Sequence, residues 1–226
     1  MYVDWSVELG ADDPVLDFPW GSGEKSCAEE NCADESRVEE PGPEEIAPES
    51  ASEMPSPEKA GTLRYYDLKA DPNLVRHLPE AQSSSELRKF LLRINAAGFP
   101  LRSAKCDHWF TQEISEEEEI FGAPCKFASY VDLLFTAPER QLAFADHEDY
   151  AAGLCHLLKG APEMPASAEI MVRRCLYADH PDHDGYYFTV YVSGFGETEP
   201  QARQRWSIAL TLVQHALVQS VKALNL

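Results

Sequence analysis

The sequence has no long hydrophobic run, and its N-terminus lacks the basic and then apolar order of a signal peptide. A membrane-spanning helix needs about 20 predominantly apolar residues, so we expect no span and a cytoplasmic location. Basic residues are also scarce, because 19 Lys and Arg stand against 39 Asp and Glu, a formal net charge of −20. Such a surface repels nucleic acid and anionic lipid headgroups, which excludes both as expected partners. A protein or a cationic ligand fits this charge better.

The motifs of common enzyme classes are absent as well. The chain has no serine elbow, no paired-carboxylate signature and no Walker motif. Gly194 and Gly196 lack the third glycine of a phosphate loop, and His147 lacks a second histidine four residues later. The six cysteines form no CxxC pair, and Cys27 and Cys32 are either incidental thiols or a redox or metal pair. We therefore expect no catalytic residue and no cofactor.

Aromatic residues are missing from a long stretch near the N-terminus, where acids and prolines are concentrated. The first 60 residues contain 17 acidic and 3 basic residues, a net charge of −14, whereas the rest of the chain has a net charge of −6. Such a composition cannot bury enough apolar surface to offset the ordering entropy. We therefore expect a disordered acidic, proline-rich linker over residues 21–60, between an apolar peptide at 1–20 and an α+β domain at 61–226.

The first 20 residues have a different character, because they are rich in the apolar and aromatic anchors that protein interfaces favour. These anchors are Trp5, Val7, Leu9, Val15, Leu16, Phe18 and Trp20. Pro14 and Pro19 argue against a long helix and favour an extended binding mode such as strand addition. We expect this peptide to dock on another protein, and the alternative is that it folds back on residues 61–226.

Three helices are predicted from capping residues and apolar spacing. Ser83 and Gly98 delimit a first helix over residues 84–97, and a second runs from Asp146 to Gly160. A third, over 199–224, has an apolar stripe wide enough to bury two sides, so we expect a homodimer through this helix. The residues that widen the stripe are Ile208, Leu212 and Val218.

Alternating runs of β-branched and aromatic residues lie between these helices and predict strands. The runs are SAKCDHWFTQEI, KFASYVDLLFT, the short QLAFA, AEIMVRRCLYA and GYYFTVYVSGF. We expect an α+β fold with an antiparallel four- to five-stranded sheet, helices packed on one face, and the order α-β-β-(β)-α-β-β-α. The acidic SEEEEI at Ser115 to Ile120 is interpreted as a solvated loop.

This element order, together with the acidic composition, resembles the class I type III secretion chaperones, small dimeric proteins that hold segments of their partners. The resemblance covers residues 84–226 and rests on the order of elements and on acidity rather than on a sequence motif. It implies a dimeric, non-enzymatic protein that binds other proteins.

Side-chain alternation assigns a surface to this function. If Phe110, Val131, Phe135, Val172, Leu176, Phe188 and Val190 face the helices, the other sheet face collects Trp109, Tyr130, Leu134, Arg173, Tyr177, Tyr187 and Tyr191. That face is aromatic enough to bind a protein partner, a dimer mate or the chain's own N-terminus, and ordinary cross-strand packing is the alternative.

The sequence thus favours a non-enzymatic protein-binding adaptor or a chaperone-like assembly factor with a tethered N-terminal docking peptide. The alternative is a small-molecule-binding or metal-dependent enzyme domain that uses His180 and His183 in the segment YADHPDHDGYY. The same segment is also typical of a hairpin loop, with Asp184 and Gly185 as a favoured turn pair.

Overall fold

The computed structural model describes residues 1–9, 16–18, 65–177 and 179–223. The predicted linker at 21–60, with its two cysteines, and Trp20 lie outside these residues. Of the helices that the structure describes, none is long and apolar enough to cross a membrane.

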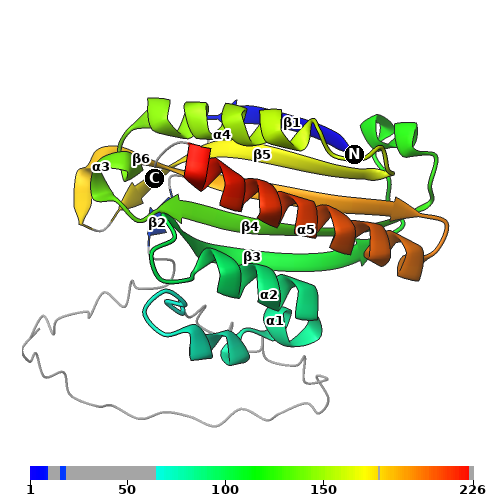
Figure 1. The fold of residues 1–226 in the computed structure, drawn as a ribbon, viewed down its shortest axis with the longest axis horizontal. Helices are drawn as coiled ribbons and strands as arrows, with labels where there is room; N and C mark the ends of the chain where they lie inside the picture. Colours follow the sequence, from blue (N-terminus) through cyan, green and yellow to red (C-terminus); the bar gives the residue numbers. More distant parts are fainter. Residues whose placement is uncertain (10–15, 19–64, 178, 224–226) are drawn as a thin grey trace, which may run out of the picture.

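The described chain forms an α+β structure around one mixed sheet (Figure 1). The strands lie in the order β1-β5-β6-β4-β3, and the short β2 also pairs with β5. Their bounds are β1 Tyr2–Glu8, β2 Leu16–Phe18, β3 Leu101–Thr111, β4 Cys125–Phe135, β5 Ala166–Tyr177 and β6 His180–Gly196. The four strands β3 to β6 pair antiparallel as expected, but β1 and β2 run parallel to β5. The prediction of an antiparallel sheet is therefore wrong at this edge, because it left out the N-terminal strands.

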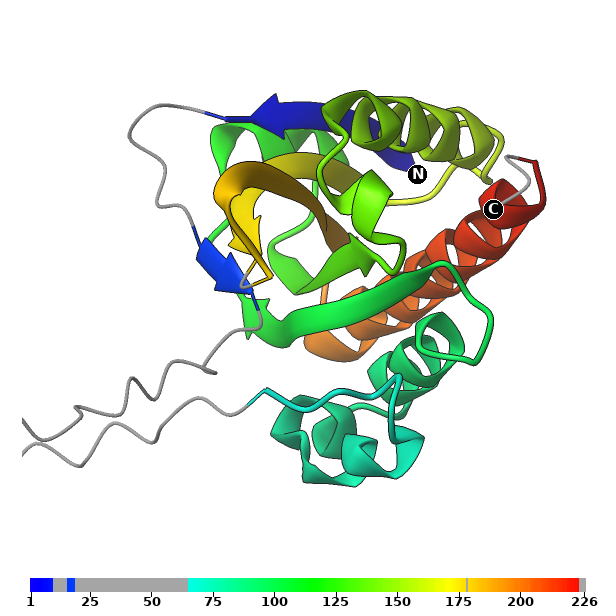
Figure 2. The same cartoon turned by 90° about the vertical axis from the view of Figure 1, so that its left-hand side faces the viewer.

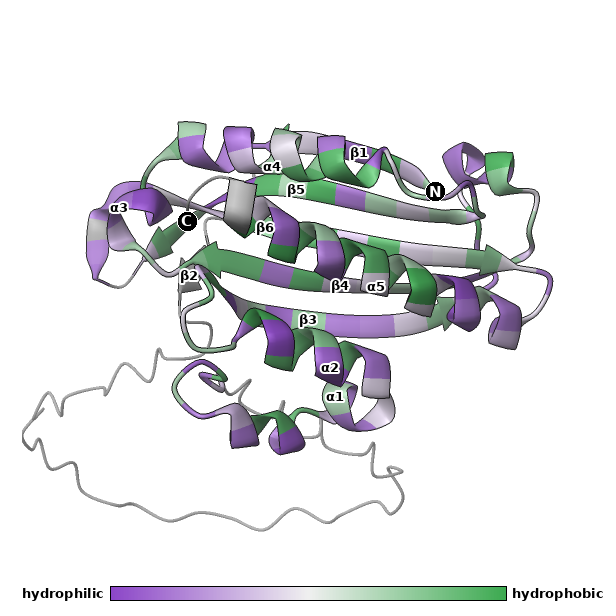
Figure 3. Ribbon diagram, in the orientation of Figure 1, coloured by the Kyte–Doolittle hydropathy of each residue, from purple (hydrophilic) through white to green (hydrophobic). Residues whose placement is uncertain are grey.

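Helices cover one face of the sheet. These are α2 (Ser85–Ile94), α4 (Phe144–Leu158) and α5 (Glu199–Ala223), and they lie on the same side in both views (Figures 1 and 2). Hydrophobic and hydrophilic residues alternate along α2 and α5 (Figure 3), which lets each helix bury one stripe on the sheet. Two short helices that were not predicted, η1 (Pro72–His77) and α1 (Pro79–Ser83), precede α2.

The helix boundaries differ from the predictions in local detail. Ser84, not Ser83, caps α2, because its Oγ accepts a hydrogen bond from the Leu87 N–H at 3.2 Å. QLAFA, expected as a short strand, instead contains the end of α3 (Pro138–Gln141) and the beginning of α4. Pro138 stands in the first turn of α3, where proline favours a helix.

The glycines before α5 serve close packing rather than a phosphate site. A Cβ on Gly194 would collide with the backbone of Ala202 and Trp206, so only glycine lets α5 approach β6 this closely. The buried Trp206 indole then donates a hydrogen bond from Nε1 to Ser129 Oγ at 2.8 Å. This contact fixes α5 on one face of the sheet, so α5 does not contact the opposite face.

Candidate protein-interaction surface

The sheet face opposite α5 is divided into a covered half and an open half. In the covered half Leu134, Cys175, Tyr177 and Tyr187 form a second small core, against which Tyr65 packs. Tyr177 and Tyr187 are only 3% and 2% exposed, and Leu134 is fully buried. These three residues cannot contact a partner directly in this structure, so the predicted surface is smaller than alternation alone indicates.

The open half contains one straight cross-strand row, which we call the tyrosine row. Strand register places Asp107 of β3 opposite Tyr130 of β4, and Tyr130 opposite Tyr191 of β6. Tyr191 in turn lies opposite Glu169 of β5, which lies opposite Asp4 of β1. Two central tyrosines are therefore flanked by carboxylates on both sides, and the row spans all five strands of the main sheet path.

Aromatic and charged neighbours extend this row. The Trp109 ring lies 6.4 Å from the Tyr130 ring, and the Tyr130 and Tyr191 rings lie 6.0 Å apart, as centroid distances. Arg173 Nη2 donates to the Tyr191 hydroxyl at 3.5 Å and forms an ion pair with Glu8 at 2.6 Å. Trp109, Tyr130, Tyr191 and Arg173 are thus the predicted contact residues that the structure brings together.

The N-terminal arm, residues 2–8, adds a strand to this surface by pairing with β5 of the same chain. Val3 and Trp5 point to the helix side and pack against the main core, whereas Asp4 and Glu8 lie on the open face. Val7 remains 40% exposed, Leu9 follows the strand, and Leu16 and Phe18 belong to β2. The structure therefore shows residues 2–8 folded back on the domain, and binding of this arm to another protein stays a prediction.

A cavity of about 320 Å³ continues the surface around the β3 edge. It lies between β3 and the chain segment that leads through η1 and α1, a segment whose packing could not be predicted from local pattern. Its apolar wall is formed by Leu68, Leu78 and Leu91, and its polar wall includes Glu80, Lys105, Asp107 and Tyr130. Because Asp107 and Tyr130 belong both to the cavity and to the tyrosine row, the two form one continuous surface.

Carboxylates add to the effect of burial on the pKa values of the groups around this cavity. Burial, followed by the charges of Glu80, Asp107 and Asp132, raises the pKa of the Cys106 thiol to about 12. Burial and then Asp132 and Asp107 raise the pKa of Tyr130 to about 12. The Cys106 thiol therefore stays protonated at neutral pH, which disfavours a nucleophilic role.

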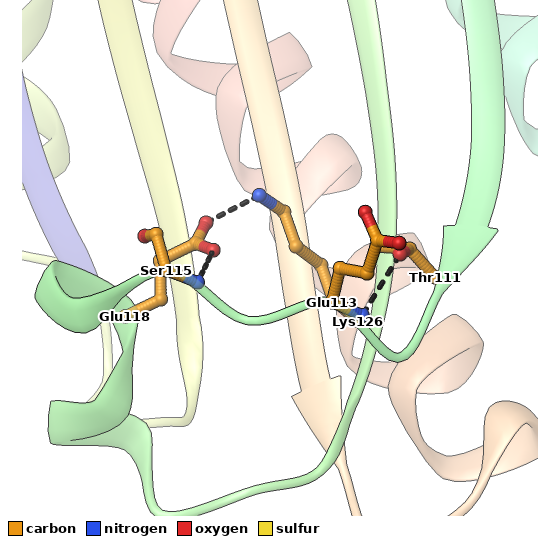
Figure 4. Close-up of polar contacts among 5 residues, drawn as sticks. All are labelled: Thr111, Glu113, Ser115, Glu118 and Lys126. Carbon is orange, nitrogen blue, oxygen red and sulfur yellow. Dashed lines mark hydrogen bonds and ion pairs between the residues drawn. The ribbon is translucent and has the colours of Figure 1, made fainter.

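Acidic residues also gather at the β1 end of the row. The SEEEEI segment, expected as a solvated loop, has no buried residue but forms the 3₁₀ helix η2 (Glu116–Phe121). The Ser115 N–H donates to Glu118 Oε2 at 3.2 Å, and Glu118 forms an ion pair with Lys126 (Figure 4). The charges of Asp4 and Glu117 contribute, after burial, to a raised pKa of Glu169. Both ends of the tyrosine row are thus electronegative.

One buried carboxyl group lies beside the row. Asp132 accepts a hydrogen bond from Thr189 Oγ1 at 2.7 Å and is almost fully buried. Burial raises its pKa to about 6, although Thr189, Lys105 and Arg173 oppose the shift. Between pH 4 and 6 the folded protein therefore holds a proton that the unfolded chain releases, so this group makes the protein more stable as pH falls.

We expect Asp132→Asn to remove this pH dependence while keeping an oxygen for the Thr189 hydrogen bond. The free energy of unfolding of the variant, relative to the wild type, should fall by about 2 kcal/mol between pH 7 and pH 4. Urea unfolding at several pH values measures this difference. His147, whose pKa burial lowers to about 4, has the opposite effect but is the same in both proteins and cancels. If the difference in unfolding free energy between the variant and the wild type does not change with pH, the pKa of Asp132 is not raised in the folded protein.

The candidate metal ligands lie in the first part of β6, where the pairing with β5 is irregular. β5 and β6 continue past the predicted loop, so Gly185 pairs with Cys175 instead of standing in a turn. A Cβ on Gly185 would collide with the Tyr177 ring, which packs over it. His180 pairs with Tyr177, whereas His183 lies in the irregular stretch between the paired residues His180 and Asp184. Within the described ranges, no group of three metal-binding side chains occurs.

Comparison with known proteins does not assign a family. No family model, no curated protein and no solved structure matches the chain. The resemblance to class I type III secretion chaperones therefore stays a prediction, and function has to be argued from the surface itself.

Proposed function

We propose that this protein is a non-enzymatic adaptor or chaperone-like assembly factor that binds another protein through the open sheet face. The binding surface consists of the tyrosine row, Trp109, Arg173 and the adjoining cavity. The observation that carries the proposal is the continuous set of aromatic side chains at Trp109, Tyr130 and Tyr191, on the sheet face opposite α2, α4 and α5.

The composition of this surface is typical of a protein interface. Tyrosine, tryptophan and arginine are the residues that contribute most to binding energy at such interfaces. An anchor cavity next to an aromatic row gives a partner side chain a place to become fully buried, which is where hot spots occur. The raised pKa of the Cys106 thiol gives no comparable support to the enzyme alternative.

The N-terminal arm has a supporting role in this proposal. β1 contributes Asp4 to the row and holds Arg173 through Glu8, so a partner that binds here contacts the arm as well. Because β1 is paired with β5, the arm holds Asp4 and Arg173 in place on the binding surface.

A homodimer through α5 is the second candidate. Ile208 is 46% exposed, which favours a contact, but Leu212 and Val218 are partly buried against the core of the same chain. The helix therefore offers a narrower apolar stripe than the sequence pattern indicates.

Photo-crosslinking from two matched positions tests which face binds a protein. A photoreactive phenylalanine analogue at position 109 should form crosslinks to another protein in the native cell. The same analogue at position 208 should form few, although Ile208 and Trp109 are similarly exposed at 46% and 38%. Crosslinks from position 208 to a second copy of the chain, with none from position 109, would assign binding to α5 instead.

A further inference from the structure

We infer that the partner segment is cationic, and that one of its lysine or arginine side chains enters the cavity between Glu80 and Asp107. This inference rests on the proposed function and adds the chemistry of the ligand.

The cavity has the two features that a long basic side chain needs. Leu68, Leu78 and Leu91 give an apolar wall for the aliphatic stem. Glu80 and Asp107 provide carboxylates for the charged head, and Lys105 is the one base among the lining residues. An arginine or lysine can therefore bury its stem and keep its charge paired, whereas an acidic side chain would face two carboxylates.

The tyrosine row favours the same chemistry. Cations bind over the faces of tyrosine and tryptophan rings, and Tyr130, Tyr191 and Trp109 provide such rings in succession. The carboxylates at the two ends of the row add Coulombic attraction. The nearby Arg173 is paired with Glu8, so its positive charge is partly neutralised and repels an incoming cation less. A segment with basic side chains at successive positions therefore meets rings and carboxylates along the whole row.

Charge complementarity excludes the other occupants. A second copy of this chain carries a net charge of −20, and its own residues 21–60 are strongly acidic, so both are repelled. Nucleic acid and anionic lipid are repelled for the same reason. A protein with a basic segment is the occupant that the charges of this surface favour.

Two short blocked peptides test the inference by calorimetric titration. One alternates alanine with arginine, and the other has citrulline, which is neutral and of similar shape, in place of arginine. We expect the arginine peptide to bind the full-length protein at least about tenfold more tightly than the citrulline peptide. Equal binding of the two, or no binding of the arginine peptide, would overturn the inference.

Two double variants separate a specific site from general attraction to an acidic protein. Glu80→Gln with Asp107→Asn should weaken binding of the arginine peptide by about tenfold. Glu139→Gln with Asp149→Asn removes the same charge from exposed positions of α3 and α4 and should change the affinity by less than about twofold. Equal losses in both variants would show non-specific attraction and overturn the inference.

The outcomes also distinguish this inference from the proposed function. If crosslinks form from position 109 while the arginine peptide fails to bind, the surface binds a protein but the partner segment is not cationic. If the peptide binds specifically while position 109 forms no crosslinks, the cationic site exists without the proposed protein partner.

Discussion

Trp5→Ala is expected to lower the free energy of unfolding by about 3 kcal/mol, although the residue lies only five positions from the N-terminus. Trp5 is partly buried and packs against the main core, next to Ile170 in the strand register. Removing the indole would leave a cavity beneath β1 and weaken the whole strand, because β1 pairs with β5 alone among the described strands. Urea unfolding of the two proteins measures the loss.

Val7→Ala is the matched control for this prediction. Val7 lies on the same strand and faces the same side, but it is 40% exposed, so its truncation should cost less than about 0.5 kcal/mol. If the Trp5 variant and the wild type were equally stable, β1 would not be paired with β5 in solution. The N-terminal arm would then be available for another protein, as the sequence first indicated.

The three long helices α2, α4 and α5 could be predicted from the sequence because their signals are local, whereas the short helices could not. The third predicted helix, at 199–224, agrees with α5 to within one residue, since a proline in the first turn and a long apolar stripe define it. The pairing of the N-terminal arm with β5 could not be predicted in the same way. The pairing of Asp4 with Glu169 is parallel and joins residues far apart in sequence, and no local pattern shows such a contact.

The aromatic face was predictable in part. Strand alternation correctly places Tyr130 and Tyr191 on the same face, because β4 and β6 pair regularly there. It gave no sign that Tyr177 would be covered, since this depends on packing over Gly185 and on the second core around Tyr65. The cavity was missed for a related reason. It forms where a register shift between Ser103 and Cys106 meets a segment from before the first predicted helix.

The affinity of a partner identified by crosslinking tests the proposed surface as a whole. Tyr130→Ala combined with Tyr191→Ala removes both central rings of the row, and a tyrosine that acts as a hot spot contributes about 2 kcal/mol or more. We therefore expect the dissociation constant to rise by at least about 100-fold. An unchanged unfolding midpoint would show that the double variant is folded.

The control removes two exposed apolar side chains from the helix side, with Leu157→Ala and Ile208→Ala. These substitutions should leave the dissociation constant within about twofold of the wild-type value, because α4 and α5 face away from the row. Calorimetric titration of the partner into the three proteins gives the decisive comparison. A 100-fold loss confined to the tyrosine variant supports binding at the open sheet face, and wild-type affinity in that variant would place the interface elsewhere.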